Sequence, residues 1–490
     1  MVAEAYLSGG IPTMSITQFS AHHSVRSPRR RFCGQIANSC DQPVRLIELS
    51  LRQDLLQEII PNALLEKVAT QTQAQDQRKR KLTCVIFFWL MILVVGPGGP
   101  VNLSQMTNHL MVAGTLAGIS ITAVELSRQA VSENLKSRPW QFFENVLNHL
   151  LTAYTGLVGM QTPALDLEMI QSLRLIDSST LRVADRLTQA FPGHRTGRKQ
   201  EWAAIKLHAA FRFFRSIPEV LALTAENIND KSVNFLLPKD QKALYVFDLG
   251  YWKYALLDEI IQRMQHFICR LQEKCNPLIQ EVYRGDPAWI GKRFFEVCLD
   301  GFTQIDLRVN VSSTGPSNPK MKHDVRLVGE IVECCWRFYL TSILDHQLYP
   351  VDLIAQIYAL RWQIELFFRD LKCVLRMQNL IALTENGVRI QIYAALIYYV
   401  LTHILMLKAA AQTQIPFEDM SVPKCLQVVG QVLMQTADLV VKDHEPNWKE
   451  FEQCLISVIQ VVHRRAWRKS PSRLSQATTR VLAPPVALRA

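Results

Sequence analysis

The sequence predicts a mixed α/β protein with a helical N-terminal region, a central region of strands and helices, and a helical C-terminal region. Three observations support this fold class. Apolar residues recur at helical spacing between about residues 45 and 160, β-rich segments begin at about residue 165, and apolar helical patterns return after about residue 350. With 490 residues, 49% of them hydrophobic, the chain can form two to four domains.

The overall charge of the chain is positive, with a formal net charge of +11 at pH 7. A basic balance indicates a polyanionic partner, with nucleic acid as the first candidate and a membrane surface as the second. The eleven cysteines contain no Cys-x-x-Cys pair and no spacing typical of metal ligands. Because free cysteines are typical of a reducing compartment, we expect a cytoplasmic protein.

The N-terminal third of the chain is expected to be helical after a basic arm. Residues 1–45 hold a run of arginines and little periodic pattern, so we expect a loose arm. Residues 46–160 predict a helical domain, which we expect to bind DNA. Its predicted helices are one that ends at Pro61 and two more at 82–95 and 140–151, with a Gly/Ala-rich stretch at 110–121 between them.

The segment 82–95 is the most apolar stretch of this region. It is apolar for about fourteen residues before a Gly/Pro-rich sequence, whereas a membrane span needs about twenty. We therefore expect a buried helix and no stable membrane association. A membrane span is the alternative, because the basic residues 78–81 would suit a cytoplasmic flank.

Two strands that end on acidic residues mark the central region. Leu173–Asp177 reads as the first strand, and Ala243–Asp248 reads as the second. The elements predicted around them are strands at 203–214 and 219–224, a turn at 227–230 and a helix at 252–271.

A second strand-rich segment, about residues 275–348, follows as an insertion. Its predicted strands are 294–299, 305–311, 325–332 and 336–344, with a loop at 312–319. After it we expect a long helix at 386–411, and a helical C-terminal region at 406–490 that ends in a basic tail.

The segment Tyr358–Lys372 predicts one amphipathic helix. Four polar positions follow in steps of three, four and seven residues: Tyr358, Arg361, Glu365 and Lys372. At about 100° per residue they fall within an arc of about 60°, so a carboxylate lies between two cations and a phenol. That set suits a metal ion and a phosphate. The opposite side is apolar: Leu353, Ile357, Leu360, Ile364, Phe367, Leu371 and Leu375.

The spacing Tyr-(2)-Arg-(3)-Glu-(6)-Lys at these positions resembles the signature of the DDE transposases in the insertion-sequence-4 group of bacterial mobile elements. The neighbouring sequences 360–368 and 385–392 are also similar to that family. The resemblance implies a ribonuclease-H-like catalytic domain at residues 165–405. In such a domain two aspartates lie on neighbouring strands, the third acid lies on a helix, and the β-rich insertion lies between the second and third acids.

Three acids are the candidate catalytic and metal-binding residues, because the resemblance maps the family's acids onto Asp177, Asp248 and Glu365. Carboxylates are ligands that Mg²⁺ prefers. Two such ions about 4 Å apart would activate a nucleophile and stabilise the leaving oxygen of a phosphodiester. We expect two Mg²⁺ ions, with Mn²⁺ able to substitute.

Other polar residues near these acids offer alternatives. Asp185 competes with the first aspartate but does not end an apolar run, and Asp258 and Glu259 compete with the second from a predicted helix. Asp230 is expected to be a turn residue. His208 lies in an apolar strand, where a histidine is more often a hydrogen-bonded core residue than a functional one.

Candidate DNA contacts come from the signature and from basic segments. The resemblance assigns contacts near the element end to Tyr358, Arg361 and Lys372. Trp362 and Trp336 could stack on an unstacked base, with core packing as the alternative. Basic loops could follow the phosphate backbone, with plain solvated loops as the alternative. Their residues are Arg195, Arg198, Lys199 and the tail 464–473.

The sequence therefore predicts a transposase that cuts DNA at insertion-sequence ends with a metal and joins the freed 3′-OH to target DNA. Its expected partners are double-stranded DNA, as terminal inverted repeats and target, and a second copy of itself in a homodimer on DNA. We expect it in the bacterial cytoplasm, associated with the nucleoid. The alternatives are a decayed or domesticated DNA-binding copy, a structure-specific nuclease of the same fold, and a membrane-associated protein.

Overall fold

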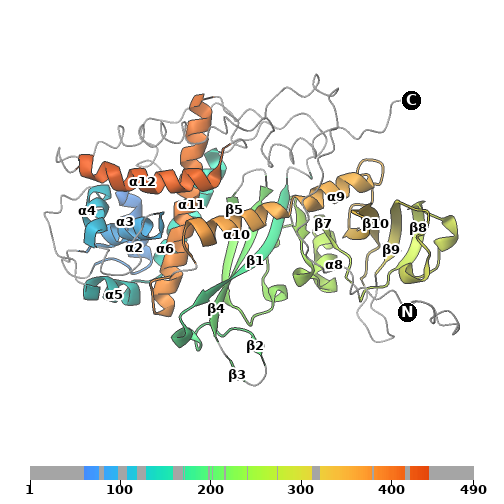
Figure 1. Ribbon diagram of the computed structural model, residues 1–490, viewed down its shortest axis with the longest axis horizontal. Coiled ribbons are helices and arrows are strands. Elements are labelled where there is room, and N and C mark those ends of the chain that lie inside the picture. The colour runs from blue at the N-terminus through green and yellow to red at the C-terminus, as the bar shows by residue number, and fades with distance from the viewer. Residues whose placement is uncertain are drawn as a thin grey trace, which may run out of the picture.

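The computed structural model describes most of the chain between residues 60 and 440, as mixed α/β structure of the class that the sequence predicts (Figure 1). The predicted arm 1–45, the helix before Pro61, the loop 312–319 and the tail 464–473 lie outside the described residues. The described residues are 60–76, 82–97, 107–117, 128–157, 169, 172–196, 199–200, 202–213, 217–239, 241–272, 274–311, 321–377, 380–413 and 420–440.

Helices make up the described N-terminal region. All residues of the apolar helix α3 are buried, which confirms the predicted buried helix at 82–95. It begins at Thr83, whose hydroxyl oxygen accepts a hydrogen bond from the Ile86 backbone N–H at 3.3 Å. The helices are α2 (Asn62–Gln71), α3 (Cys84–Val95), α4 (Thr107–Leu116), α5 (Arg128–Ser137) and α6 (Gln141–Leu157).

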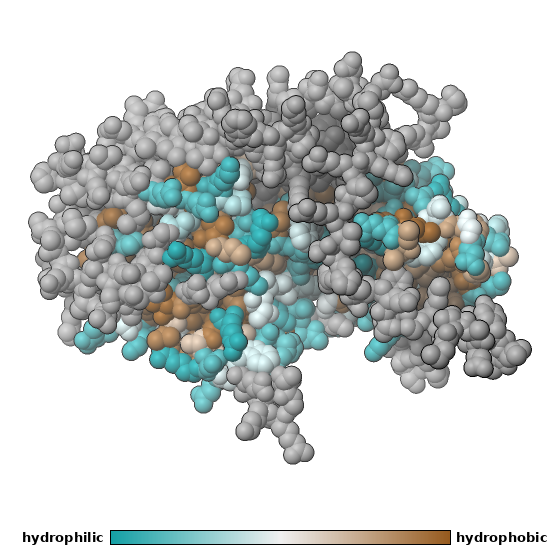
Figure 2. Space-filling view, in the orientation of Figure 1, coloured by the Kyte–Doolittle hydropathy of each residue, from teal (hydrophilic) through white to brown (hydrophobic). Residues whose placement is uncertain are grey.

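The long helix α11 (Glu385–Thr413) packs among the N-terminal helices and confirms the helix predicted at 386–411. It contacts α3, α5, α6 and α12 (Val422–Val440). By length and apolar composition α11 could cross a membrane, but its apolar window is 100% buried within the protein. A helix that is apolar all round is expected in the core of a large protein. On the face drawn in Figure 2, hydrophilic residues are interspersed with hydrophobic ones over the described surface.

A large sheet of nine strands has the order β5-β4-β1-β6-β7-β11-β10-β9-β8. β4 runs antiparallel to β1 and β5, whereas β6 runs parallel to both β1 and β7. The insertion strands extend the same sheet by antiparallel pairing. The strands are β1 (Leu173–Val183), β4 (Ala203–Arg212), β5 (Ile217–Ala225), β6 (Leu244–Phe247), β7 (His266–Arg270), β8 (Leu278–Arg284), β9 (Gln304–Asn310), β10 (Val325–Val332) and β11 (Cys335–Thr341).

Two predictions in the first half of this sheet are wrong. β1 does not end at Asp177 but continues to Val183, because β4 stays paired with it beyond the end of β6. The helix predicted at 252–271 is also too long. Its helical part, α8 (Tyr254–Gln262), is followed at Met264 by a positive φ of 59°, and the chain then enters β7.

Most of the strands predicted in the insertion form. β9, β10 and β11 correspond to the segments predicted at 305–311, 325–332 and 336–344. The predicted strand 294–299 is wrong, because this segment forms the short 3₁₀ helix η8 (Phe294–Glu296). β8, which the sequence did not predict, forms the outer edge of the sheet.

The sheet has a hydrophobic core on each face. Leu175 and Val246 belong to the core that α10 (Trp362–Arg369) and the N-terminal helices share. Ile176 and Phe247 belong to the opposite core, which includes residues of α8. Because strand side chains alternate between faces, the residues that follow Ile176 and Phe247 point toward the α10 side. Figure 1 shows α10 crossing this part of the sheet.

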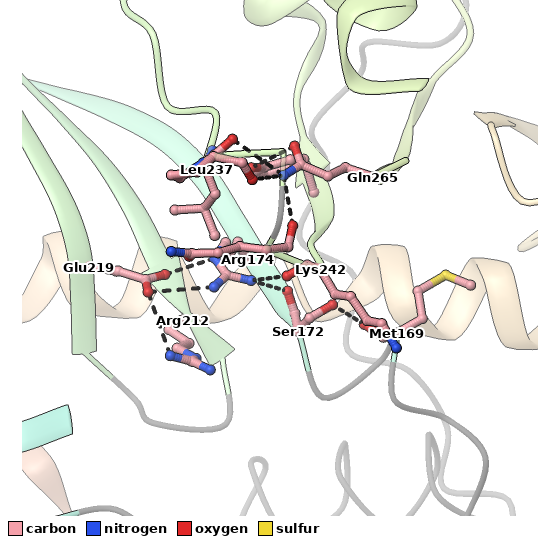
Figure 3. Close-up of polar contacts among 11 residues, drawn as sticks. Met169, Ser172, Arg174, Arg212, Glu219, Leu237, Lys242 and Gln265 are labelled. Atoms are coloured by element: carbon pink, nitrogen blue, oxygen red, sulfur yellow. Dashed lines mark hydrogen bonds and ion pairs between the residues drawn. The ribbon is translucent and has the colours of Figure 1, made fainter. Parts of the chain in front are cut away.

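A polar cluster fixes the start of β1 (Figure 3). The buried Arg174 guanidinium donates to Glu219 of β5 at 2.7 Å and to the backbone carbonyl oxygens of Ser172 at 2.6 Å and Lys242 at 3.4 Å. Arg212 of β4 pairs with the same glutamate at 3.5 Å. Because Lys242 lies just before β6, these bonds hold β1, β5 and the chain entering β6 in fixed relative positions.

The prediction of one continuous helix over Tyr358–Lys372 is wrong, although Tyr358, Arg361 and Glu365 stay together on one face. The segment divides into α9 (Val351–Ala359), α10 and the π-helix η9 (Asp370–Val374). Between α9 and α10, Arg361 N–H bonds to the Tyr358 carbonyl at 3.0 Å. Such a 3₁₀-type bond makes positions i and i+3 eclipse, so Arg361 stays aligned with Tyr358. All seven apolar residues predicted on the opposite side are buried.

Asp370, at the start of η9, carries a buried carboxyl group that should make stability depend on pH. Burial raises its pKa from 3.8 to about 6, although Arg369 donates to it at 3.2 Å. The ionised form therefore costs stability, fully above about pH 6 and not at all below pH 3.8. We expect Asp370→Asn to raise the free energy of unfolding by up to about 3 kcal/mol at pH 7.5 and by about half that at pH 5.

Urea unfolding at the two pH values measures this difference. Asp352→Asn, at an exposed position on α9, is the matched control and should change little at either pH. A gain that is the same at pH 5 and pH 7.5 would show that titration of Asp370 is not its cause.

Candidate active site

Two candidate acids lie next to each other at the end of the parallel pair β1 and β6. The register pairs Ile176 with Phe247, so Asp177 and Asp248 occupy the next positions on adjacent strands. By strand alternation both side chains point to the α10 face. β6 ends at Phe247, and the Asp248 side chain caps the 3₁₀ helix η6 (Leu249–Tyr251). The two strands that were predicted to lead into acidic residues therefore lie side by side and place these two carboxylates next to each other.

Arg361 connects this pair to the third candidate acid, Glu365. Its Nη1 lies 2.9 Å from Asp177 Oδ2, and its Nη2 lies 2.5 Å from Glu365 Oε1. The charge of Asp248 also acts on Asp177 and on Arg361. The side chains of Asp177, Arg361 and Glu365 remain 21%, 20% and 31% exposed, so solvent reaches the cluster.

The pKa of Asp177 is raised mainly by burial and to a smaller extent by the neighbouring acids. Burial raises it from 3.8 to about 6. The Arg361 guanidinium and the Ser178 backbone N–H, which donates to Asp177 Oδ1 at 2.8 Å, oppose that rise. The charges of Asp248 and Glu365 add to it. Like charges in a partly buried site raise a carboxyl pKa, and a bound cation reverses the effect.

The donor set fits a hard divalent cation. All three acids supply carboxylate oxygens, which Mg²⁺ and Mn²⁺ accept. In each aspartate a backbone N–H, from Ser178 or Leu249, donates to one oxygen at 2.8 Å, and this bond orients the carboxylate. Among the described residues no group of three His, Cys, Asp or Glu side chains is close enough to hold a metal as placed. Arg361 instead bridges two of the acids, so a metal would have to displace it.

Arg361 should therefore compete with a metal. Replacing Arg361 by Gln removes a cation next to the metal position, which should relieve repulsion on the order of 1 kcal/mol or more. We expect Mn²⁺ to bind at least about fivefold more tightly at pH 8, measured by calorimetric titration without DNA. Arg369→Gln is the matched control, because Arg369 lies on the same helix but pairs with Asp370. Unchanged or weaker Mn²⁺ binding in Arg361→Gln would contradict the competition.

The other signature residues lie at different distances from the acids. The Tyr358 ring packs against Tyr339 with 4.9 Å between ring centroids, and burial raises the pKa of its hydroxyl. Trp362, next to Arg361, is 49% exposed, so core packing does not explain its position. Lys372 lies on η9, and partial burial lowers its pKa. No contact between Lys372 and the three acids occurs within the described residues.

The remaining DNA-contact candidates are less well defined. Trp336 stacks on Phe338 with 5.5 Å between ring centroids and packs against the second core, as its packing alternative expects. Arg195 and Lys199 lie on the small hairpin β2–β3 (Arg195–Thr196, Lys199–Gln200), which extends from the sheet in Figure 1. Their side chains and the whole of Arg198 lie outside what the structure describes.

The competing acids have partners elsewhere. Asp258 and Glu259 lie on α8, which packs on the opposite face of the sheet. There Asp258 accepts from the Lys322 backbone N–H at 3.0 Å. Asp185 lies beyond the end of β1, where its carboxylate is 69% exposed. His208 is fully buried and hydrogen-bonded, as expected for a core histidine.

Arg270 is a charged neighbour of the acids that the sequence analysis missed. Phe247 of β6 pairs with Cys269 of β7, so Arg270 takes the position beside Asp248. Its charge acts on Tyr358, and it makes no ion pair with a carboxylate of the described residues. The signal was a β-rich segment ending on a charged residue, as in the other two strands. It was hidden because 252–271 was read as one helix.

Residues 169–401 match the model of a protein family described as the transposase DDE domain. The central part of this chain is therefore a DDE transposase domain. The match begins just before β1 and ends within α11, so it includes every element that carries Asp177, Asp248 and Glu365. The resemblance to DDE transposases that was seen at Tyr358, Arg361, Glu365 and Lys372 is thereby confirmed.

Relatives of this domain are named as transposases. A putative transposase y4zB of Sinorhizobium fredii is 29% identical over 47% of this chain and 60% of its own length. A probable transposase for the element IS5377 of Geobacillus stearothermophilus is 26% identical over 59% of this chain and 70% of its own. The transposase for IS231E of Bacillus thuringiensis is 22% identical over 74% of this chain and 80% of its own. The match to the IS231E transposase is consistent with the insertion-sequence-4 group.

One solved structure, a cryo-EM structure of a piggyBac transposase synaptic complex with hairpin DNA, aligns with 91% of this chain and 89% of its own. Its TM-score is 0.39 and its sequence identity is 10%.

Proposed function

We propose that the protein is a transposase that cuts DNA at the ends of an insertion sequence and transfers the freed 3′-OH into target DNA. The observation that supports this most is the convergence of Asp177, Asp248 and Glu365 on Arg361 within a DDE transposase domain. The strand order β5-β4-β1-β6-β7, with β6 and β7 parallel to β1, supports a ribonuclease-H-like core.

The three acids would hold divalent cations, which we propose to be two Mg²⁺ ions with Mn²⁺ able to substitute. When bound, such ions supply Lewis acidity to the attacking and leaving oxygens of the phosphodiester. The chain orients the ligands, because backbone N–H groups fix the two aspartates and α10 presents Glu365. Arg361, once released from a carboxylate, can donate to a phosphate through its planar fork.

Cations and rings beside the acids would bind the DNA strand. We assign phosphate contacts to Arg270 and Lys372 and a phosphate hydrogen bond to Tyr358. The exposed Trp362 ring is suited to stack on an unpaired base. Arg195, Arg198 and Lys199 on the β2–β3 hairpin would follow the backbone further along the duplex. The net charge of +11 is consistent with such a partner.

The larger assignments extend the same proposal. The helical region 46–160 would bind the terminal inverted repeat, the domain 165–405 would cut and join DNA, and the helical region 406–490 would support them. The active form would be a homodimer that brings two element ends together, at the nucleoid in the bacterial cytoplasm.

A cleavage assay tests the proposal. The substrate is a labelled duplex that carries the terminal sequence flanking this gene, incubated with Mg²⁺ or with EDTA, and a duplex with a shuffled end is the control. We expect a nick at the natural end and joining of the 3′-OH to target DNA, both only with Mg²⁺. Binding without cutting would favour the decayed copy. Cutting of branched DNA irrespective of the end sequence would favour the structure-specific nuclease.

A further inference from the structure

Asp230 is a fourth acid beside the site, on the other face of the sheet from Asp177. It begins the 3₁₀ helix η5 (Asp230–Ser232), which follows the turn after β5. The loop brings it behind β1, where Ser178 and His208 are paired across β1 and β4. Its side chain is only 22% exposed, so the carboxylate is largely buried against the sheet.

The Asp230 carboxylate contacts the turns of both candidate aspartates. The Ser178 hydroxyl, next to Asp177, donates to Asp230 Oδ1 at 3.2 Å. On the other side, Gly250 lies two residues after Asp248. A Cβ placed there would be 3.2 Å from Asp230 Oδ2, so the η6 backbone and this carboxylate are in close contact. One side chain thus touches both turns that present the aspartates.

Neighbouring groups hold Asp230 in this position. Lys206 Nζ lies 3.0 Å from Asp230 Oδ1 and also donates to the Ile228 carbonyl at 3.1 Å. His208 Nδ1 lies 3.6 Å from Asp230 Oδ1 and 3.4 Å from the Tyr251 hydroxyl. Burial lowers the pKa of His208 to about 4, so the charge of Asp230 is balanced by Lys206 at neutral pH. Because Lys206 neutralises Asp230, this acid is a poor candidate for a metal ligand.

We propose that Asp230 is a positioning residue that holds the Asp177 and Asp248 turns at a fixed separation and thereby sets the affinity of the site for a divalent cation. The proposal rests on the assignment of those two aspartates as metal ligands. Groups that orient metal ligands through a second layer of hydrogen bonds commonly change metal affinity or activity by about 10- to 100-fold when removed.

Mn²⁺ titration of the DNA-free, full-length protein tests this. We expect Asp230→Ala to bind Mn²⁺ about 10- to 100-fold more weakly than wild type, while its DNA affinity in EDTA is unchanged. Asp230→Asn keeps an oxygen that accepts from Ser178 and Lys206, so it should restore most of the affinity. Asp258→Ala is the matched control, because Asp258 is a hydrogen-bonded acid on the same face of the sheet whose partners are Lys322 and His323. It should bind Mn²⁺ as wild type does.

Wild-type Mn²⁺ affinity in folded Asp230→Ala would overturn the proposal, as would an equal loss in Asp258→Ala. If Asp230→Ala does not fold, Ser178→Ala serves instead. It removes one hydroxyl and should weaken Mn²⁺ binding about fivefold, the usual effect of one hydrogen bond, and no change there would also overturn it. Failure of the proposed function has a separate signature: wild type binds Mn²⁺ at Asp177 but leaves element-end DNA uncut.

Discussion

Replacing Glu365 by Gln should abolish metal-dependent cleavage of DNA while leaving the fold intact. The substitution keeps the size of the side chain and a hydrogen bond to Arg361, but it removes one of three carboxylates. A catalytic metal ion supplies several kcal/mol of charge stabilisation to the transition state. Because each 1.36 kcal/mol changes a rate tenfold, the expected loss of cleavage rate is on the order of 10³-fold. Single-turnover cleavage of an element-end duplex measures it.

Glu385→Gln is the matched control for this prediction. Glu385 forms the same i,i+4 pair on α11, with Arg389 at 3.1 Å, that Glu365 forms with Arg361 on α10. It lies on α11, which carries none of the three acids, so the control should cleave as wild type does. Cleavage by Glu365→Gln at the wild-type rate would exclude Glu365 from the site.

Replacing Arg326 by Ala should strongly lower the free energy of unfolding. The Arg326 guanidinium is 0% exposed and binds Asp306 through two bonds of 2.6 and 2.5 Å. It also donates to the Tyr349 carbonyl at 2.7 Å, just before α9. Without Arg326 the Asp306 charge would stay buried and unpaired. Breaking a buried pair in this way typically costs about 3–5 kcal/mol of unfolding free energy.

A double variant separates the effect of the unpaired Asp306 charge from the effect of losing the packed Arg326 side chain. Arg326→Met with Asp306→Leu removes both charges, so it should regain most of the stability that Arg326→Ala loses. Arg308→Met is the control, because Arg308 is 40% exposed and its pairs should contribute about 1 kcal/mol or less. Urea unfolding measures the three effects, and hydrogen exchange shows whether β9 and β10 open first. A double variant as unstable as Arg326→Ala would mean that packing, rather than the unpaired charge, causes the loss.

Local patterns were enough to predict most of the elements that carry the site. The apolar run at 82–95, the β-rich composition of β10 and the apolar strand before Asp248 are all visible in short stretches of sequence. The alignment of Tyr358, Arg361 and Glu365 also survived, because residues three and four apart stay neighbours whether the turn is 3₁₀ or α. The 3₁₀ turn at Arg361 and the π-helix after Arg369 were not predictable from local pattern, because they lie where α10 packs against β1 and η9 packs against α12, and these contacts are long-range.

Long-range pairing explains what the sequence analysis missed. Arg270 entered the site only because β7 pairs with β6, and a helical reading of 252–271 concealed that strand. Asp230 was expected in a turn but begins the 3₁₀ helix η5 just after one, and its contact with Ser178 spans 52 residues of sequence. The bridge from Arg361 to Asp177 spans 184 residues. No local pattern encodes such contacts, because they depend on the order of strands in the folded sheet.

The most direct test of the central claim is a Mn²⁺ titration of the DNA-free protein. It compares wild type with the single variants Asp177→Asn, Asp248→Asn and Glu365→Gln. If the three acids form one metal site, each variant should lose most of the Mn²⁺ affinity of wild type while keeping its folded structure. Wild-type affinity in all three folded variants would contradict a metal site built from these acids.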